Sequence, residues 1–296
     1  MAFTQGKHET PYCIDSHVHL YPDAVAKKVT QPLAERFGNP PSFDGTVEGC
    51  VLKDCADHIA ASINLPVATR AQSVEHTNHF WSAFTPYAYA HGDREISSGA
   101  NGARVYSLAS FHPLVEDKRR VLESIAQDHF TGIKFHPEYQ QFRYNDSSMD
   151  EVWRIMADLG LVAYFHAGGE RVFKPPYRSS PAEIARLQER FASLRIVAAH
   201  LGGFGMWDET EREIVGSTVY LDLSHTFFWA EKEQIRRIIE NHGAGRILFG
   251  TDAPWQDPGK VLAEFLSLDL DATSREAILW RNAARLFSLP VDGTRE

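Results

Sequence analysis

Short apolar runs recur along the chain, and each is followed by a stretch with helical spacing. Eight runs have the length of a strand: residues 12–20, 58–65, 105–112, 132–136, 161–166, 195–200, 218–224 and 246–252. Helix start and stop signals lie between them, such as Ser180-Pro181 ahead of residues 182–191 and Gly243 after residues 231–242. The pattern predicts alternating strands and helices, with a parallel sheet covered on both faces.

Eight strand–helix units favour a closed (β/α)8 barrel, the TIM barrel of the α/β class, over an open sheet. The chain has 296 residues, which is room for a barrel of about 250 residues with insertions. The first two strand-to-strand steps are the longest, which places insertions after strands 1 and 2, in residues 38–45 and 91–102. No domain boundary is visible, so we expect residues 1–296 to form a single domain.

Composition identifies an ordinary folded protein and narrows its partners. With 43% hydrophobic and 23% charged residues, the chain is not disordered, collagen-like or a coiled coil. Its formal net charge of -9 argues against binding to nucleic acid or to an anionic membrane. We expect a small-molecule substrate as the partner, no nucleic acid and no membrane, with a homodimer left open.

The cysteines and the N-terminal residues indicate the cellular compartment in which the protein is expected. The spacings of Cys13, Cys50 and Cys55 match no disulfide framework, zinc ribbon or redox pair. Residues 1–17 lack the apolar segment of a secretory signal, and no stretch approaches the ~18 apolar residues of a membrane span. We therefore expect a cytoplasmic protein.

Histidines gather where the expected strands end. The chain has 14 histidines, and seven of them lie within one residue of the end of a run: His17, His19, His112, His136, His166, His200 and His225. Asp252 ends the eighth run in the same way. Because the carboxyl ends of barrel strands meet at one mouth, where barrel active sites lie, we expect these side chains to converge there.

The His-x-His pair in the first run indicates a metal site. Residues i and i+2 of a strand share a face, so His17 and His19 both point into the barrel if Val18 packs outward. Two imidazoles, further strand-end histidines and a carboxylate form a nitrogen and oxygen ligand set. Such a set suits zinc first, with iron, manganese or nickel as alternatives.

Lys134 lies in the fourth run and is unusual there. If Ile133 and Phe135 face the helices, Lys134 and His136 point into the barrel, where an unpaired ammonium is costly. Either Lys134 pairs with a carboxylate or with an acidic group of the substrate, or it is carbamylated into a bridging ligand. We expect one divalent metal, with a second only if Lys134 is carbamylated.

Six motifs in order, DSHVHL, GIKFHP, YFHAGG, VAAHLGG, ILFGTDAPW and NAARLF, resemble the amidohydrolase superfamily and, within it, the amidohydrolase-related metal-dependent hydrolases of the barrel fold. The resemblance covers residues 12–288. It implies that His17 and His19 bind the metal. His166 is then the fifth-strand histidine, His200 the sixth-strand histidine and Asp252 the eighth-strand aspartate. We assign His17, His19, His166 and Asp252 to the metal, and Asp252 and His200 to catalysis.

The resemblance leaves the reaction open. The first hypothesis is a metal-dependent hydrolase, in which a metal-activated water attacks a small amide, ester or lactone. Asp252 then takes the water proton and returns it to the leaving group, while His200, if it is not a metal ligand, polarises the carbonyl. The alternative is a metal-dependent decarboxylase of an aromatic or enoic acid, with Asp252 or His200 delivering a proton to carbon. A non-catalytic metal- or ligand-binding barrel is a third class.

Residues near the strand ends suggest what binds there. The candidates for substrate contact are Lys134, His136, Tyr139, Arg171 and Trp255. Aromatic rings beside cationic groups suit a substrate with an apolar or aromatic body and an acidic group.

Overall fold

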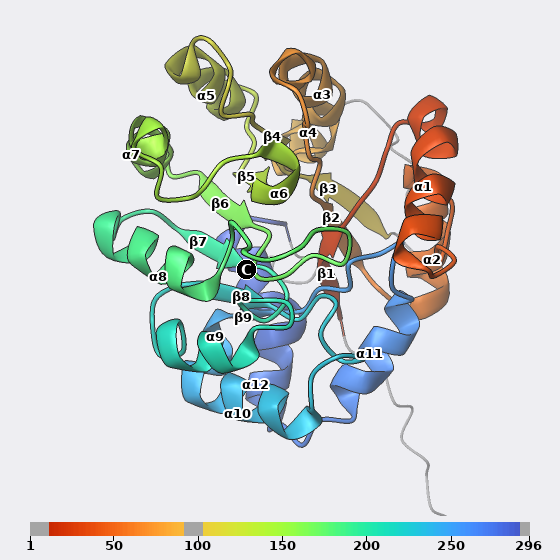
Figure 1. The fold of residues 1–296 in the computed structure, drawn as a ribbon. Helices are drawn as coiled ribbons and strands as arrows, with labels where there is room; N and C mark the ends of the chain where they lie inside the picture. Colours follow the sequence, from red (N-terminus) through yellow and green to blue (C-terminus); the bar gives the residue numbers. More distant parts are fainter. Residues whose placement is uncertain (1–11, 92–102, 291–296) are drawn as a thin grey trace, which may run out of the picture.

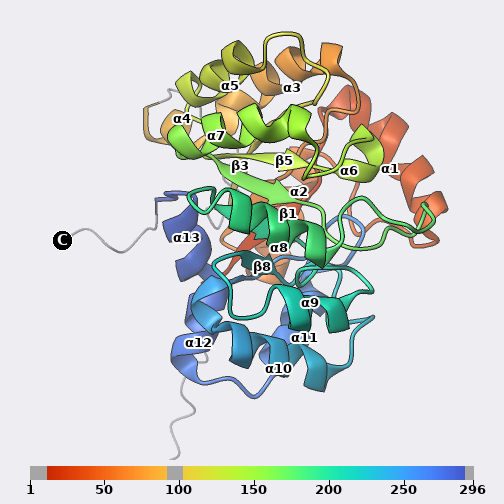
Figure 2. The same ribbon diagram turned by 60° about the vertical axis from the view of Figure 1, so that its left-hand side comes forward.

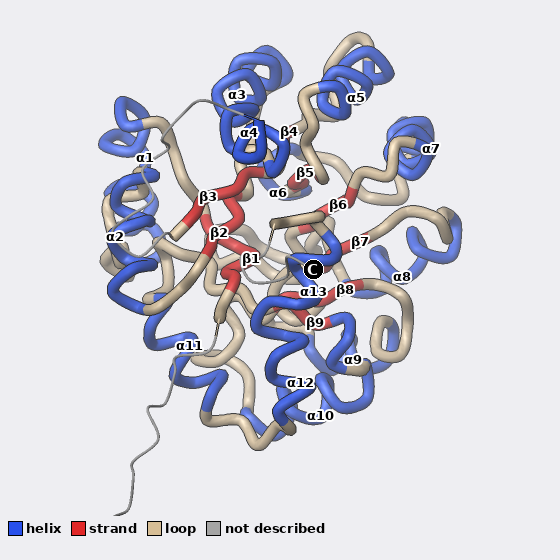
Figure 3. Tube along the Cα trace, turned by 180° about the vertical axis from the view of Figure 1, so that it is seen from behind, coloured by secondary structure: helices blue, strands red, loops and turns tan. Residues whose placement is uncertain are grey.

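The computed structural model describes residues 12–91 and 103–290, which form a ring of helices around a barrel of parallel strands (Figures 1 and 3). The strands are β1 (Ile14–Val18), β2 (Ala61–Asn64), β3 (Arg104–Ser107), β4 (Ala109–Ser110), β5 (Gly132–Phe135), β6 (Val162–Phe165), β7 (Ile196–Ala198), β8 (Tyr220–Asp222) and β9 (Ile247–Leu248). They pair in the orders β1-β2-β3 and β4 through β9. Each expected run holds one strand, except that β3 and β4 share the third.

The barrel closes at both junctions between these sheets. β3 and β4 are two parts of one passage of the chain, separated only by Leu108, whose N–H donates to the carbonyl of Asn64 at 3.0 Å. On the other side, the N–H of Ser16 donates to the carbonyl of Phe249 at 2.9 Å, and Val18 forms a parallel bridge with Ala253. The predicted (β/α)8 fold is confirmed.

Helices occupy the connections between strands. They are α1 (Asp23–Phe37), α2 (Val47–Asp57), α3 (Val74–Trp81), α4 (Pro86–His91), α5 (Lys118–Gln127), α6 (Pro137–Gln140), α7 (Asp150–Asp158), α8 (Pro181–Arg190), α9 (Trp207–Glu213), α10 (Lys232–His242), α11 (Pro258–Leu266), α12 (Ala272–Glu276) and α13 (Asn282–Leu286). Ser180 caps α8 by accepting the N–H of Glu183, and Gly243 follows α10, as their sequence signals predict. Within the described residues, no helix has the length and hydropathy needed to span a bilayer.

The two long connections carry extra helices. α1 and α2 both lie between β1 and β2, with residues 38–45 joining them, and α3 and α4 follow β2. Residues 92–102 of the second expected insertion lie outside the described residues.

Two apolar layers set the direction of each strand side chain. The outer layer packs strands on helices, and in it Phe135 contacts Trp153 with ring centroids 5.1 Å apart. The inner layer fills the barrel, where Tyr164 stacks on Phe287 at 6.2 Å. α13 closes the amino-terminal end of the barrel, while α6 lies at the opposite end (Figures 2 and 3). Polar strand residues therefore collect at the carboxyl end.

An irregularity in β1 points both histidines of the His-x-His pair into the mouth. Regular alternation would put Ile14 and Val18 on one face. Instead, Ile14 belongs to the inner layer and Val18 to the outer layer, because the register against β2 shifts between Asp15 and Val18. With Val18 packed outward, His17 and His19 both reach the cavity at the mouth.

Asp54 is a buried residue of α2 that forms a hydrogen bond to Ser62 of β2, and its titration provides a test of the fold. Its Oδ2 accepts the hydroxyl of Ser62 at 2.8 Å and the thiol of Cys50 at 3.6 Å. Burial outweighs these hydrogen bonds and raises the pKa of Asp54 from 3.8 to about 7.

As pH rises from about 4 to 7, the free energy of unfolding of the wild-type protein falls, and we predict that it falls less steeply in Asp54→Asn. In this window the folded protein keeps a proton on Asp54 that the unfolded chain releases, so the free energy of unfolding falls as pH rises, by up to ~1.4 kcal/mol per pH unit. Denaturant unfolding of both proteins across this range measures the difference. Parallel pH profiles for the two proteins would contradict the assignment.

Candidate functional site

Side chains from separate strand ends meet at the mouth of the barrel, as their positions in the sequence predict. One cavity of about 480 Å³ is lined by the strand-end residues His17, His19, Lys134, His136, His166, His200 and Asp252. Three residues in the segments that follow β7, β8 and β9 have left-handed backbones: His200 (φ 59°), His225 (φ 52°) and Asp252 (φ 68°). Residues other than glycine rarely adopt this conformation, and strain of this kind is concentrated at functional sites.

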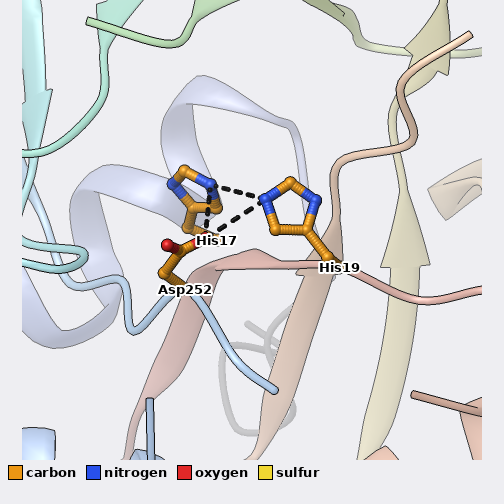
Figure 4. Close-up of side chains that lie close together, drawn as sticks. All are labelled: His17, His19 and Asp252. Carbon is orange, nitrogen blue, oxygen red and sulfur yellow. Dashed lines mark hydrogen bonds and ion pairs between the residues drawn. The ribbon is translucent and has the colours of Figure 1, made fainter. Parts of the chain in front are cut away.

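His17, His19 and Asp252 form a compact triangle (Figure 4). The Nε2 atoms of the two histidines are 3.2 Å apart, and the Oδ1 atom of Asp252 lies 3.4 Å from His17 Nε2 and 3.2 Å from His19 Nε2. Ligand atoms of a tetrahedral zinc ion, each ~2.0–2.1 Å from the metal, are separated by about 3.3–3.4 Å. The three atoms therefore have the spacing of three metal ligands.

Hydrogen bonds on the far side of each imidazole fix the tautomers. Nδ1 of His17 lies 2.8 Å from Oδ2 of Asp222, and Nδ1 of His19 lies 3.1 Å from the carbonyl oxygen of Leu65. Both partners only accept, so each Nδ1 carries the proton and each Nε2 presents a lone pair. Burial and the nearby Lys134 lower the pKa of His17 to about 3, which keeps it neutral at pH 7. Three acceptors thus converge, and a cation complements them.

Asp222 is a supporting residue that the sequence analysis missed. It accepts the hydroxyl of Tyr164 at 2.6 Å and the N–H groups of His200 at 3.0 Å and Ser224 at 2.8 Å, as well as the Ser224 hydroxyl. Burial acts to raise the pKa of Asp222, but the neighbouring His17 outweighs it and holds the pKa below its usual range. The sequence does contain a sign of this role: Asp222 lies between Leu221 and Leu223 in a strand covered on both faces, and a buried carboxylate there needs hydrogen-bond partners.

His166 and His200 form a second pair beside the triangle. His166 Nδ1 lies 3.1 Å from His200 Nε2, while His166 Nε2 is 3.0 Å from the carbonyl of Gly169 and His200 Nδ1 is 3.2 Å from the carbonyl of Ser224. Both carbonyls require a donor, so the facing nitrogens again present lone pairs. The structure does not bring His166 into the triangle, and its assignment as a metal ligand stays a prediction.

Two more groups extend this pair. His136 stacks on His166 with ring centroids 4.1 Å apart, and its Nε2 lies 3.5 Å from Oε2 of Glu170, a residue that the sequence analysis did not single out. Burial lowers the pKa values of His136, His166 and His200, so these rings are held neutral.

Asp252 has a different partner for each oxygen. Oδ1 belongs to the triangle, while Oδ2 lies 3.2 Å from Nδ1 of His225. Burial alone would raise the pKa of Asp252, but the contacts with His19 and His225 hold it well below its usual range. The carboxylate is therefore ionised and oriented.

Lys134 is fully buried beside the triangle. Its Nζ lies 3.4 Å from His17 Nε2 and 5.1 Å from the ring centre of Tyr164. No direct ion pair joins it to a carboxylate among residues 12–91 and 103–290. Burial lowers the pKa of Lys134 to about 8, against the opposing charges of Asp222 and Asp252. Lys134 is thus a cation held next to an acceptor cluster.

The remaining candidates for substrate contact divide between two hollows. Tyr139 and Trp255 line the large cavity. Arg171 lines a smaller hollow of about 40 Å³, which Trp255 also borders, and it stacks on Trp229 at 5.0 Å. Arg171 therefore borders the smaller, adjoining hollow, which shares Asp252 and His166 with the main cavity.

Comparison with known proteins identifies the family of this chain. The family model described as amidohydrolase matches residues 14–289. The chain belongs to the amidohydrolase family. A search of curated proteins gives no match.

Solved structures share the barrel of this amidohydrolase at low identity. A 5-carboxyvanillate decarboxylase from Sphingomonas paucimobilis is 15% identical with a TM-score of 0.70, covering 95% of this chain and 100% of its own. A dihydroxybenzoic acid decarboxylase from Polaromonas sp. JS666, with bound manganese and an inhibitor, is 17% identical with a TM-score of 0.67, covering 94% and 97%. A Pseudomonas putida protein named as a 2-pyrone-4,6-dicarboxylic acid hydrolase is 14% identical with a TM-score of 0.64, covering 96% and 100%.

We predict that the protein holds about one equivalent of divalent metal and that His19→Ala removes it while the fold persists. His19 lies at the rim of an independently packed core, and the Asp252 carboxylate that it contacts keeps His225 as a second partner at 3.2 Å. Elemental analysis and thermal unfolding measure the two effects. Full metal content in His19→Ala would remove this residue from the site.

The matched control is His112→Ala, another buried histidine that follows a strand but lies outside the triangle. It is expected to keep the metal.

Loading the protein with metal in bicarbonate buffer tests for a second metal ion, and we expect the metal content to stay near one equivalent per chain. Two equivalents that fall to one in Lys134→Ala would show that a carbamylated Lys134 bridges two ions.

Proposed function

We propose that this amidohydrolase is a metal-dependent hydrolase of a carbonyl compound, an ester, lactone or amide. The observation that carries the proposal is the triangle of His17, His19 and Asp252, whose three acceptor atoms lie 3.2–3.4 Å apart. Neutral imidazoles with fixed tautomers and an ionised carboxylate form a ligand set for a divalent ion.

The ligand set fits zinc first, and manganese has the same preference for nitrogen and oxygen donors when no thiolate is present. His17, His19 and Asp252 would hold the ion, with His166 as the further ligand that the motif order suggests. Such an ion supplies Lewis acidity, which polarises a carbonyl oxygen and lowers the pKa of water.

Asp252 is placed to move the proton. As the oxygen of water bonds to the carbonyl carbon, its proton passes to the Asp252 carboxylate, and it then goes to the leaving oxygen or nitrogen as the carbon–heteroatom bond breaks. His225 orients Asp252 through Oδ2, at 3.2 Å. Because the side chains of His225 and Asp252 are only 11% and 12% exposed, water competes little with this contact.

The contacts of His200 change the role first expected for it. Its Nδ1 donates toward Ser224, so the neutral ring presents a lone pair at Nε2 and cannot polarise a carbonyl by donation. We therefore propose His200 as a proton acceptor or ligand. Lys134, which carries donors and lies 3.4 Å from His17 Nε2, is the better candidate for contact with the substrate oxygen.

The same geometry supports a second candidate, a metal-dependent decarboxylase. Lys134 is a buried cation, and the carboxylate of an acidic substrate would pair with it in the cavity. In this reaction Asp252 or His200 first takes up a proton from water. The bond between the ring or alkene carbon and the carboxylate then breaks, carbon dioxide leaves, and that proton passes to the carbon. The bound manganese and the decarboxylase activity of a similar structure support this alternative by analogy of fold alone.

A panel of esters, lactones, amides and aromatic or enoic acids, run in H₂¹⁸O and separately in D₂O, decides between these candidates. A hydrolase places ¹⁸O in the acid product. A decarboxylase releases carbon dioxide and places deuterium on carbon. A metal-loaded protein inert to the whole panel would support the third class, a barrel that binds metal or ligand without turnover.

We predict that Asp252→Asn lowers kcat by about 10²- to 10⁴-fold while metal content falls far less. The amide oxygen can still approach the metal, but it accepts no proton from water, so the proton-transfer contribution is lost. Steady-state kinetics and elemental analysis measure the two effects. Asp208→Asn, an exposed change on α9, is the control and is expected to leave both unchanged. More than about a tenth of the wild-type kcat in metal-loaded Asp252→Asn would assign the base to another group, His200 first.

A further inference from the structure

We propose that the substrate carries an extended, uncharged apolar body that lies between α1 and α3 while its reacting group meets the strand-end residues. This inference rests on the proposed function and goes beyond it, because neither the metal site nor the proton-transfer residues require a body of this kind. Three features of the large cavity carry it: the apolar face of α1, the facing wall of α3, and the distribution of charge.

α1 turns its larger apolar side chains toward the cavity. The helix buries only small residues against the rest of the protein: Ala26, Thr30 and Ala34. Its larger apolar residues repeat at a spacing of four and line the cavity: Val25, Val29, Leu33 and Phe37. Val25 remains 41% exposed. A ligand that covers this apolar helix face removes apolar surface from water, and this favours binding of the ligand.

α3 and the residues after β2 supply the opposite wall. Phe80 and Trp81 of α3 line the cavity, with ring centroids 4.9 Å apart in an edge-to-face arrangement. Phe80 is 38% exposed, although Trp81 is buried. Leu65, Pro66 and Val67 continue this wall toward the strand ends. α1 and α3 border the mouth on neighbouring sectors of the ring (Figure 1).

Charge is confined to the inner end of the cavity. The only Asp, Glu, Lys or Arg residues among its described lining are Lys134, Glu170 and Asp252. Asp252 belongs to the triangle, Lys134 lies next to it, and Glu170 follows β6 and contacts His136. The walls formed by α1 and α3 carry no such residue, and the polar lining of α3 is limited to His76 and Thr77. They therefore offer no carboxylate, ammonium or guanidinium partner for a second charged group on the substrate.

The volumes decide where the body lies. The cavity between α1 and α3 measures about 480 Å³, within the range of about 300–1,000 Å³ typical of pockets for drug-sized ligands. The adjoining hollow, which shares Asp252 and Trp255 with the cavity, measures about 40 Å³ and holds no more than a small group. A substrate whose carbonyl or carboxylate lies at the triangle must therefore extend toward α1 and α3. A two-ring aromatic unit or an acyl chain of similar length fits this description.

A series of straight-chain hydroxamic acids, from acetohydroxamic to octanohydroxamic acid, tests the inference on the zinc-loaded protein by calorimetry. The head group chelates the metal and the tail probes the walls. Affinity is expected to rise about fourfold per added methylene as each group leaves water. Val29→Asp should flatten this rise, with at least a tenfold loss for the longest member and little change for acetohydroxamic acid. Gln31→Asp places the same charge on the exposed side of α1 and should keep the wild-type slope.

A second probe separates this inference from the proposed function. Prodan, an uncharged two-ring dye, is titrated into metal-free protein by fluorescence, and Val29→Asp, but not Gln31→Asp, should weaken its binding at least tenfold. This result, together with no binding of acetohydroxamic acid to protein exposed to zinc, would support the apolar site and count against the metal enzyme. A flat hydroxamate series in the wild type, no prodan binding, or equal losses in the two variants would overturn the inference.

Discussion

The hydrogen bond between His17 Nδ1 and Asp222 Oδ2, at 2.8 Å inside the barrel, is the contact on which the site depends. It fixes the proton on the far side of His17 and so turns the Nε2 lone pair toward His19 and Asp252. Asp222 is held in turn by Tyr164, whose ring stacks on Phe287. Three successive contacts, Phe287 with Tyr164, Tyr164 with Asp222 and Asp222 with His17, thereby link the apolar interior of the barrel to the acceptor atoms at its mouth.

This arrangement imposes an electrostatic constraint. Lone pairs converge at the triangle of His17, His19 and Asp252, and again where His166 faces His200 at 3.1 Å. Burial lowers the pKa values of the histidines and so prevents protons from relieving the repulsion. Lys134 supplies one positive charge nearby, but its own pKa is lowered by burial. Acceptors held rigidly by strand ends, with few protons to share, form a site prepared for a cation.

The sequence predicts those features that follow from periodicity and from barrel geometry. Apolar runs gave the strands, and the convergence of strand ends placed His17 near Asp252 across most of the chain length. Ile133 and Phe135 face outward as expected, which directs Lys134 inward. The direction of Ile14 could not be read in this way, because the register shift in β1 reverses its face and depends on pairing with β2.

Other features depend on contacts between distant residues, which no local pattern contains. Asp222 of β8 reaches His17 of β1 only because the barrel closes, with β8 next to β9 and the end of β9 next to β1. The tautomer of His200 depends on a carbonyl in the loop after β8, so its donor role could not be judged from its position at a strand end. The four-residue spacing of Val25, Val29 and Leu33 does not distinguish a core face from a cavity wall, and only the structure shows that these residues line a cavity.

The position of α1 and α3 in the fold explains how chemistry and selectivity can be separated in this chain. Both helices belong to the long connections after β1 and β2, while the triangle is built from strand ends that pair directly with their neighbours. A change of shape on the inner face of α1 therefore alters the walls of the cavity without moving His17 or Asp252. Barrel enzymes vary their substrates through loops on a constant scaffold. Here the variable element is a helix whose larger apolar residues face the cavity, so the identity of Val25, Val29 and Leu33 bears on which body is accepted more than on whether the barrel folds.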